Sequence, residues 1–229
     1  MVESAAGLKG PPYPPPPRGE WHWPPQLTVV MAIALQLLLP DRLYAGPKWL
    51  LPALEGLLLI ALVISAPQRL EAPHSGRRVM MISLTALVSI ANGIALVLLS
   101  HLLLNRGLSS GNQGHQLIID GSEIWLTNVL LFAFWYWEVD RGGPGLRAAG
   151  RDGCPDFQFL QMTDEVAALY PGWRPQFVDY LYVSLTNATA FSPTDTMPLS
   201  VQAKSLMGLQ SLISLVTIGL VVSRAVNIL

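Results

Sequence analysis

The chain alternates between long apolar runs and segments rich in proline, glycine and charge. A helix that crosses a bilayer needs roughly 20 predominantly apolar residues. Runs of about that length predict five such helices, at residues 27–39, 48–66, 79–104, 118–137 and 204–227. The third run is the strongest because it holds no formal charge, and the first is the weakest because it is short. Since backbone polar groups in lipid must be satisfied within the segment, the pattern predicts an all-α integral membrane protein.

The polar segments divide the chain into three parts. Residues 1–25 are rich in proline and predict a disordered, solvated polyproline tail. Residues 26–117 hold the first three predicted helices, and residues 118–229 hold the last two. Within this last part, a linker at 139–175 leads to a short amphipathic run at 176–185 and a polar segment at 186–200. The short run cannot cross a bilayer, so we predict one re-entrant helix before the last span.

Composition supports the membrane assignment and excludes other classes. Charged residues make up 13% of the chain, against roughly 25% in an ordinary soluble domain. A net charge of -1 leaves no basic excess, so we expect no nucleic-acid partner. The single cysteine, Cys154, has no partner for an internal disulfide. Arginine supplies most of the 14 basic residues, which is typical of a G+C-rich genome. With the predicted spans, we expect a bacterial, multi-pass protein of the inner (plasma) membrane.

Motifs of an enzyme are missing from the sequence. It contains no Gly-x-Ser-x-Gly, no His-Glu-x-x-His and no glycine-rich phosphate loop. His101 with His115, or Asp120 with Glu123, would supply only two ligands to a metal, which is weak support for a site. We therefore expect no enzymatic activity, no cofactor and no metal.

Four stretches near the end of the chain carry a resemblance. They are Tyr-Leu-Tyr-Val-Ser-Leu-Thr at 180–186, Thr189, Asp-Thr-Met-Pro at 195–198, and Ala-Lys-Ser-Leu-Met-Gly-Leu-Gln at 203–210. Together they resemble the pore module of the tetrameric potassium-channel superfamily. The resemblance implies an outer helix at 118–137, a pore helix at 176–185, a filter-like loop at 186–200 and an inner helix from Lys204. It also implies a homotetramer that conducts cations.

The filter segment departs from that family. Potassium channels place a Thr-Val-Gly-Tyr-Gly type segment here, whose carbonyl oxygens replace the hydration shell of the ion. This chain has no glycine at 186–195, Phe191 resists a positive φ, and Pro193 locks its own φ. We expect a looser constriction that passes small cations with weak selectivity, because the negative ends of pore helices favour a cation. Its candidate ion-pathway residues are Thr186, Thr189, Ala190, Phe191, Ser192, Thr194 and Asp195.

The last predicted span contains several small or polar side chains: Gly208, Gln210, Ser211, Ser214 and Thr217. In a pore these residues would line a water-filled path, whereas in lipid the same residues let helices pack closely. An unpaired amide in hydrocarbon is costly, so we expect Gln210 at a cavity or a subunit contact.

Other interpretations stay open at this point. The run at 176–185 is also typical of an interfacial connector, which would leave a non-conducting membrane scaffold or partner-binding protein. A small-solute transporter is disfavoured because no repeat is visible. Orientation is open too: the resemblance places Arg69, Arg77 and Arg78 outside, whereas the positive-inside tendency prefers them in the cytoplasm.

Overall fold

A computed structural model describes residues 23–38, 53, 56, 57, 60, 75–105, 111–148, 153–189 and 196–226. These parts of the chain are predominantly helical. The long helices are α1 (Trp23–Leu38), α3 (Ser75–Asn105), α4 (Gly111–Val139) and α8 (Val201–Val226). The shorter elements are η2 (Asp140–Gly142), α5 (Pro144–Ala148), β1 (Phe157–Gln158), η3 (Leu160–Met162), α6 (Asp164–Ala167), α7 (Phe177–Thr189) and β2 (Met197–Pro198).

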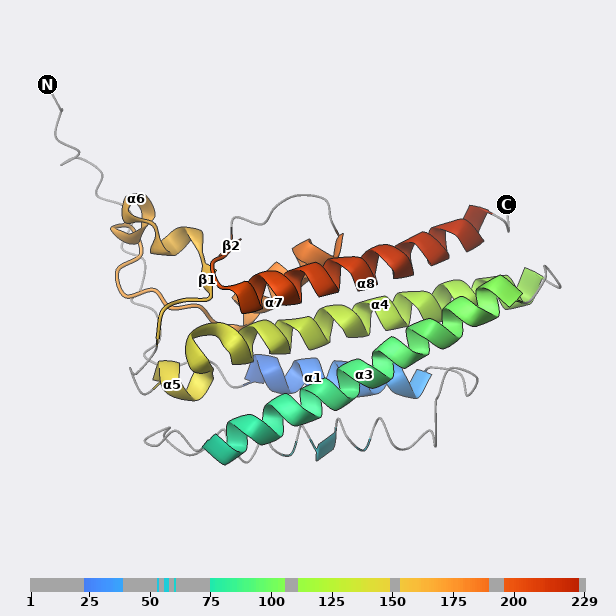
Figure 1. Cartoon of the computed structure of the whole chain (residues 1–229), viewed down its shortest axis with the longest axis horizontal. Helices are drawn as coiled ribbons and strands as arrows, with labels where there is room; N and C mark the ends of the chain where they lie inside the picture. Colours follow the sequence, from blue (N-terminus) through green and yellow to red (C-terminus); the bar gives the residue numbers. More distant parts are fainter. Residues whose placement is uncertain are drawn as a thin grey trace, which may run out of the picture.

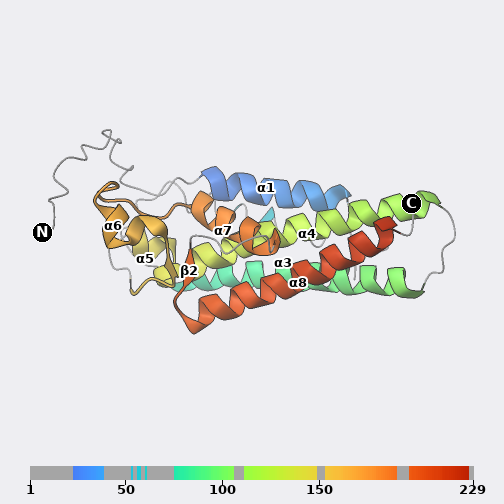
Figure 2. The same ribbon diagram turned by 90° about the horizontal axis from the view of Figure 1, so that it is seen from above.

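Helix α4 is the centre of the bundle. It packs against α1, α3, α7 and α8, and Figure 1 shows it running between α8 and α3. Figure 2 gives the same arrangement from above, with α1 along the opposite side of α4 from α3 and α8. Close packing with α8 is helped by Gly121, where a Cβ would lie 2.5 Å from a methyl group of Val221.

Aromatic side chains make the core at one end of the bundle. They come from the carboxyl-terminal half of α4, from β1 and from α7. Phe177 packs against Phe134, with ring centroids 5.0 Å apart, and against Trp137 at 5.6 Å. Phe157 lies 5.1 Å from the ring of Tyr136. The aromatic residues that close the predicted fourth span therefore anchor the linker and α7 to the bundle.

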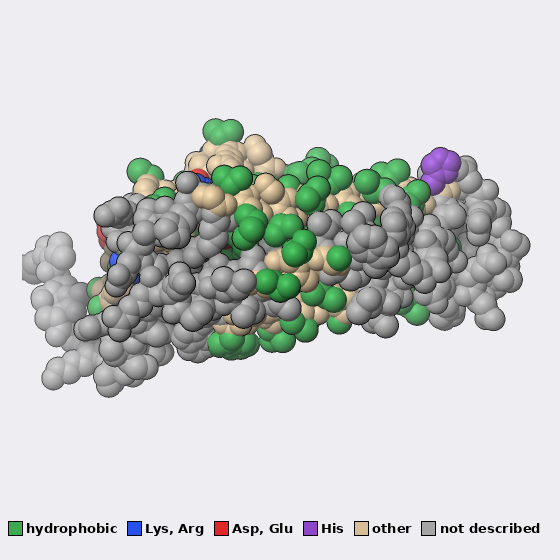
Figure 3. Space-filling view, turned by 90° about the horizontal axis from the view of Figure 1, so that it is seen from below, with side chains coloured by type: hydrophobic (Ala, Val, Ile, Leu, Met, Phe, Trp, Pro, Cys, Tyr) green, Lys and Arg blue, Asp and Glu red, His purple; other side chains and the backbone are tan. Residues whose placement is uncertain are grey.

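The linker's short elements gather at this same end, where α4 ends and α8 begins (Figure 1). Strand β1 pairs antiparallel with β2, with Phe157 opposite Pro198 and Gln158 opposite Met197. The face drawn in Figure 3 has hydrophobic side chains along its middle, and its described Lys, Arg, Asp and Glu side chains lie at the linker end. This distribution is typical of a chain whose middle lies in hydrocarbon.

Among the described residues, three helices are long and apolar enough to cross a membrane: Arg78–His101, Leu117–Gly142 and Val201–Ser223. The prediction of membrane-length apolar helices is therefore confirmed for the third, fourth and fifth runs. The first run forms α1, whose 16 residues fall short of that length. The second run, 48–66, is described only at residues 53, 56, 57 and 60, so most of it lies outside the described residues. Five spans are thus not confirmed.

Several helix boundaries differ from those predicted. Helix α4 begins at Gly111 and α8 begins at Val201, both before the predicted starts. Helix α7 continues to Thr189, so the prediction that the helix ends at 185 is wrong. The reason is that no glycine or proline interrupts 176–189, and the Asn187 side chain bonds to Met207 and Gln210 of α8. The fold also contains one two-stranded pair, β1 and β2, that an all-α description omits.

Candidate functional site

Helix α7 carries a polar face that the other helices cover. Tyr180, Ser184 and Asn187 are spaced four and then three residues apart, so they lie on one side of the helix. Tyr180 and Ser184 are fully buried, and Asn187 is half-buried. This face contacts α4 and α8. Ser184 and Asn187 make hydrogen bonds with these two helices, and Tyr180 donates to Asp140, just after α4.

Gln210 is at the centre of these contacts, and it is fully buried on α8. Its Nε2 donates to the hydroxyl of Ser184 at 2.7 Å and to the carbonyl of Ser184 at 3.0 Å. Its Oε1 accepts from Nδ2 of Asn187 at 2.8 Å and from the hydroxyl of Tyr136. Both ends of the amide are therefore satisfied, which offsets the cost of burying it among apolar helices.

Asn187 extends the network to the neighbouring turn of α8. Its Nδ2 also donates to the carbonyl of Met207 at 3.0 Å, and its Oδ1 accepts from the hydroxyl of Ser211 at 3.1 Å. Since Asn187 is two residues from the end of α7, these bonds fix the carboxyl-terminal end of α7 to the first half of α8.

Helix α4 joins the network through two further bonds. The hydroxyl of Ser184 donates to the carbonyl of Val129 at 2.6 Å. Nδ2 of Asn128 donates to the hydroxyl of Ser214 at 3.2 Å. We name the whole set the Gln210 cluster: Asn128, Tyr136, Ser184, Asn187, Gln210, Ser211 and Ser214. It contains amides and hydroxyls but no ionisable carboxylate or base, as expected where the surroundings are apolar.

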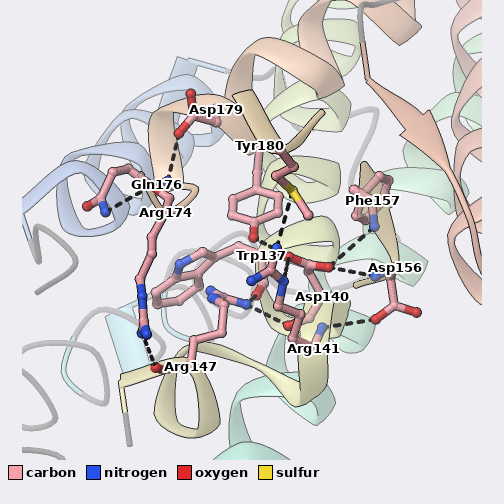
Figure 4. A network of polar contacts seen from close by, with 11 residues as sticks. Trp137, Asp140, Arg141, Arg147, Asp156, Phe157, Arg174, Gln176, Asp179 and Tyr180 are labelled. Carbon is pink, nitrogen blue, oxygen red and sulfur yellow. Dashed lines mark hydrogen bonds and ion pairs between the residues drawn. The ribbon is translucent and has the colours of Figure 1, made fainter. Parts of the chain in front are cut away.

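A second cluster holds the other end of α7, and Figure 4 draws it. Asp140 follows the last residue of α4 and is fully buried. Its Oδ2 accepts from the hydroxyl of Tyr180 at 2.6 Å, and its Oδ1 accepts from the backbone N–H of Asp156 at 2.8 Å and of Phe157 at 3.3 Å. One carboxylate thus ties together the end of α4, strand β1 and α7.

Arg147 covers the carboxyl-terminal end of α4. It is buried, and its Nη1 donates to the carbonyls of Trp137 at 2.9 Å and of Asp140 at 2.6 Å. The last carbonyls of a helix have no partner within it, and a guanidinium suits both their geometry and the negative end of the dipole. The guanidinium also lies 5.3 Å from the centre of the Tyr180 ring (Figure 4). We name Asp140, Arg141, Arg147, Asp156 and Tyr180 the Asp140 cluster.

The turn that leaves α4 has a left-handed backbone. Arg141, Gly142 and Gly143 have φ values of 53, 80 and 98°. A side chain at Gly143 would be strained, because its Cβ would lie 3.1 Å from the carbonyl oxygen of Glu138. The N–H of Arg141 donates to Oδ2 of Asp156 at 3.0 Å, which holds the one non-glycine residue of this turn in place.

The first turn of α7 has its own cap. Oδ2 of Asp179 accepts from the backbone N–H of Gln176 at 2.7 Å, as a carboxylate three residues into a helix commonly does. Burial raises the pKa of the Asp179 carboxyl, and the bond from Gln176 partly opposes that rise. The carboxylate also favours the positive end of the helix dipole.

The predicted ion-pathway residues fall into two groups. Thr186 and Thr189 lie on α7, where their hydroxyls donate to the carbonyls of Tyr182 at 2.8 Å and of Thr186 at 2.9 Å. The remaining predictions lie outside the described residues: Ala190, Phe191, Ser192, Thr194 and Asp195.

The predicted residues of the inner helix lie on different sides of α8. Gln210, Ser214 and Thr217 are buried at intervals of four and three residues, on the side that faces α4 and α7. Ser211 is half-buried against Asn187, and Gly208 is exposed. The buried residues therefore pack between helices of the same chain, and Gln210 finds its hydrogen-bond partners within that chain.

Other ionisable groups in the spans form no metal site in the part of the chain that the structure describes. Asp120 and Glu123 are both buried near the start of α4, and His101 lies exposed near the end of α3. The described residues include no group of three or more His, Cys, Asp or Glu side chains that could hold a metal.

Sequence reasoning missed the Asp140 cluster and most of the Gln210 cluster. A signal was present, because Tyr180, Ser184 and Asn187 share one face of α7, and Gln210, Ser214 and Thr217 share one face of α8. Two helices with matching polar stripes predict a buried contact between them. For Asp140 and Arg147, by contrast, the sequence shows only a charged, glycine-rich linker.

The segment that contains α7 begins and ends at the linker end of the bundle. Helix α7 begins beside Asp140 at the end of α4, and Ser184 lies beside Val129, ten residues before that end. By Met197 the chain is again at the linker end, where β2 pairs with β1 and the N–H of Leu199 donates to the carbonyl of Asp156 at 2.8 Å. The segment from 177 to 198 thus starts and finishes at the same end of the bundle.

Comparisons with known proteins give no relative for this architecture. No model of a known protein family matches the chain, and neither the curated proteins nor the solved structures contain a significant match.

Proposed function

We propose that this protein is the pore-forming subunit of a homotetrameric channel that passes small cations with weak selectivity. One observation carries the proposal: α7 enters from the linker end and packs against both α4 and α8, and the chain is at that same end again at Met197. In this proposal α4 is the outer helix, α7 the re-entrant pore helix and α8 the inner helix.

The depth of α7 supports a re-entrant helix. Ten residues of α4 separate Val129 from Val139, which is about 15 Å along a helix. Half of a roughly 30 Å hydrocarbon core is a similar distance. If α4 crosses the bilayer, Ser184 lies near the bilayer centre, and the carboxyl-terminal end of α7 lies little more than one turn beyond it. The negative partial charge of that helix end favours a cation.

The polar contacts of α7 fit this position. A helix resting on headgroups has water to satisfy its side chains, and it needs no buried partners. The side chains of Ser184 and Asn187 instead form their hydrogen bonds with residues of α4 and α8 inside the bundle. Burial of such groups is the condition under which polar side chains are tolerated at membrane depth.

Helix α8 offers the surface that an oligomer needs. Only 17% of its most apolar window is buried within the chain, against 61% for α4. Large apolar side chains make up its exposed face: Leu209, Leu212, Leu215, Val216 and Val222. Copies of the chain packed through this face would bring their 186–195 segments around one axis, where Thr186, Thr189 and Asp195 belong to the proposed constriction.

Cysteine cross-linking tests the geometry directly. In a Cys154→Ser background, Thr194→Cys should form oxidised dimers in membranes, because the segments meet at the axis. The matched control is Ser122→Cys, an exposed position of α4 at the far end from the linker, which should remain uncross-linked. Equal cross-linking at both positions, or a stable monomer in detergent, would contradict the proposal.

Flux measurements separate a channel from a scaffold. Purified protein in liposomes should move potassium, sodium and thallium at comparable rates, since the constriction has no stack of carbonyl sites. Asp195→Asn should lower that flux by removing the proposed acidic ring, whereas Asp164→Asn, on exposed α6, should leave it unchanged. Tetramers that pass none of the three ions would instead support a non-conducting membrane scaffold.

A further inference from the structure

A cavity lies between α3, α4 and α8, on the opposite side of the α4·α8 contact from α7. Its volume is about 240 Å³. Its lining includes Ser89 and Asn92 of α3, Asn128 and Trp135 of α4, and Leu209 and Ile213 of α8. These residues fall in the middle of the three helices that are long and apolar enough to cross a membrane.

Two amide oxygens in the lining have unused acceptor capacity. Asn128 uses its Nδ2 to reach Ser214, and Asn92 uses its Nδ2 to reach the carbonyl of Ile124 at 3.4 Å. Neither Oδ1 accepts a hydrogen bond from any residue that the structure describes. The third polar group is already satisfied, because the Ser89 hydroxyl accepts from Nε1 of Trp135 at 3.0 Å and donates to the carbonyl of Thr85 at 2.7 Å.

The rest of the wall is apolar, and it opens sideways. Ala86, Ile90, Leu131, Phe132 and Leu206 complete most of the lining. Ile90 and Leu209 are 62% and 51% exposed, so the rim of the cavity faces the surface of α3 and α8 rather than either end of the bundle. In a bilayer, molecules that enter by this route come from the hydrocarbon.

Size and polarity together define the occupant. An engineered apolar cavity of roughly 150 Å³ accepts benzene, and this one is larger. A plain hydrocarbon would leave both amide oxygens buried without a donor, which is costly. A molecule with one apolar ring and one hydroxyl is compact enough for this volume and supplies a donor to one of the two oxygens.

We propose that this cavity binds a membrane-partitioned phenol or a similarly compact ring alcohol, whose hydroxyl donates to the amide oxygen of Asn92 or Asn128. The site is next to Leu206 and Leu209, one position away from Met207 and Gln210 on the same helix. A bound molecule would therefore contact both α8 and α4 where the two helices pack together. Binding itself needs no conduction, so this proposal stands or falls separately from the channel.

Quenching of tryptophan fluorescence tests the proposal with two matched probes. Para-bromophenol and bromobenzene carry the same quenching bromine and differ in the hydroxyl. In liposomes, at equal measured concentrations in the membrane, bromophenol should quench the Trp135 component saturably and at about fivefold lower concentration, as one extra hydrogen bond allows. The Trp135→Phe variant identifies that component. Equal concentration dependence for the two probes, or quenching without saturation, would overturn the assignment.

A filled cavity provides the second arm. Gly93 lines the cavity, and a Cβ there would meet no atom within 4 Å, so Gly93→Leu introduces an apolar side chain at the cavity wall. Saturable quenching of Trp135 should disappear in this variant. Gly76→Leu, also on α3 and also open around its Cβ but outside the cavity, should quench as the parent protein does. Unchanged quenching in Gly93→Leu would overturn the proposal.

Discussion

The two polar clusters hold opposite ends of the same short helix with different chemistry. The Gln210 cluster fixes the carboxyl-terminal end of α7 with amides and hydroxyls only. The Asp140 cluster fixes the amino-terminal end with a buried carboxylate, two guanidinium groups and backbone N–H groups. One lies alongside apolar helices, and the other lies where the chain leaves α4 in a turn of left-handed residues.

The difference follows from what each environment can satisfy. Between straight helices the backbone is already paired, so a charge would have few donors to stabilise it, and neutral groups that both donate and accept are cheaper to bury. At the end of α4 the last carbonyls and the first N–H groups of the linker are unpaired. Asp140 and Arg147 satisfy these groups, and the charges are stabilised in return. We therefore expect each residue of the Asp140 cluster to contribute more to the free energy of unfolding than each residue of the Gln210 cluster.

Asp140→Ala should have the largest effect. It leaves the Tyr180 hydroxyl and two backbone N–H groups without their acceptor and removes the charge beside Arg141. We expect the free energy of unfolding to fall by about 3–5 kcal/mol, as when one partner of a buried pair is removed. Denaturant titration of the detergent-purified protein measures it. Glu165→Ala, an exposed acid on α6, should change stability by less than about 0.5 kcal/mol.

Gln210→Leu should come next. The side chain keeps a similar volume, but Ser184, Asn187 and Tyr136 lose hydrogen bonds inside the bundle. We expect a loss of about 2–4 kcal/mol in the same titration, because several buried polar groups are left unpaired. Gln202→Leu makes the same change at an exposed position of α8 and should be close to neutral. If Gln210→Leu costs more than Asp140→Ala, our ranking of the two clusters is wrong.

A pair of tyrosines compares the clusters one hydroxyl at a time. Tyr180→Phe removes a 2.6 Å bond to a carboxylate, for which we expect a cost of about 1.5–3 kcal/mol. Tyr136→Phe removes bonds to neutral amides, for which we expect about 1 kcal/mol. Both rings keep their aromatic contacts. Equal losses would mean that charge adds nothing at the Asp140 cluster.

Asp179→Asn should have the smallest effect, and it depends on pH. Burial raises the pKa of this carboxyl above its ordinary value of 3.8. The native state then binds more protons than the unfolded state just above pH 4, so the free energy of unfolding falls as pH rises through that interval. Asparagine does not titrate, yet it still accepts a bond from Gln176.

Melting temperatures of the two proteins therefore test the sign. The stability of Asp179→Asn relative to the parent should be greater at pH 7 than at pH 4. The control, Asp164→Asn on exposed α6, should show no such change. A relative stability that falls between pH 4 and pH 7 would show that the capping carboxylate matters more than its burial.

The sequence predicts some features of the candidate site and not others. The stripes on α7 and α8 are local, because residues three or four apart must share a helical face. Their pairing is not local: Tyr136 meets Gln210 across 74 positions, and Asn128 meets Ser214 across 86. The carboxyl-terminal end of α7 differs from the prediction for the same reason, since the partners of Asn187 lie on α8, 20 and 23 positions along the chain.

By itself, the sequence determined that this chain has apolar helices of membrane length, because hydropathy adds up over contiguous residues and needs no knowledge of neighbours. Only the tertiary structure decided that α4 is central, that Gln210 is paired within one subunit, and that Asp140 and Arg147 close the end of α4. Those outcomes depend on which helix faces pack together, and that packing is determined by the side chains of all the helices, which lie far apart in the sequence.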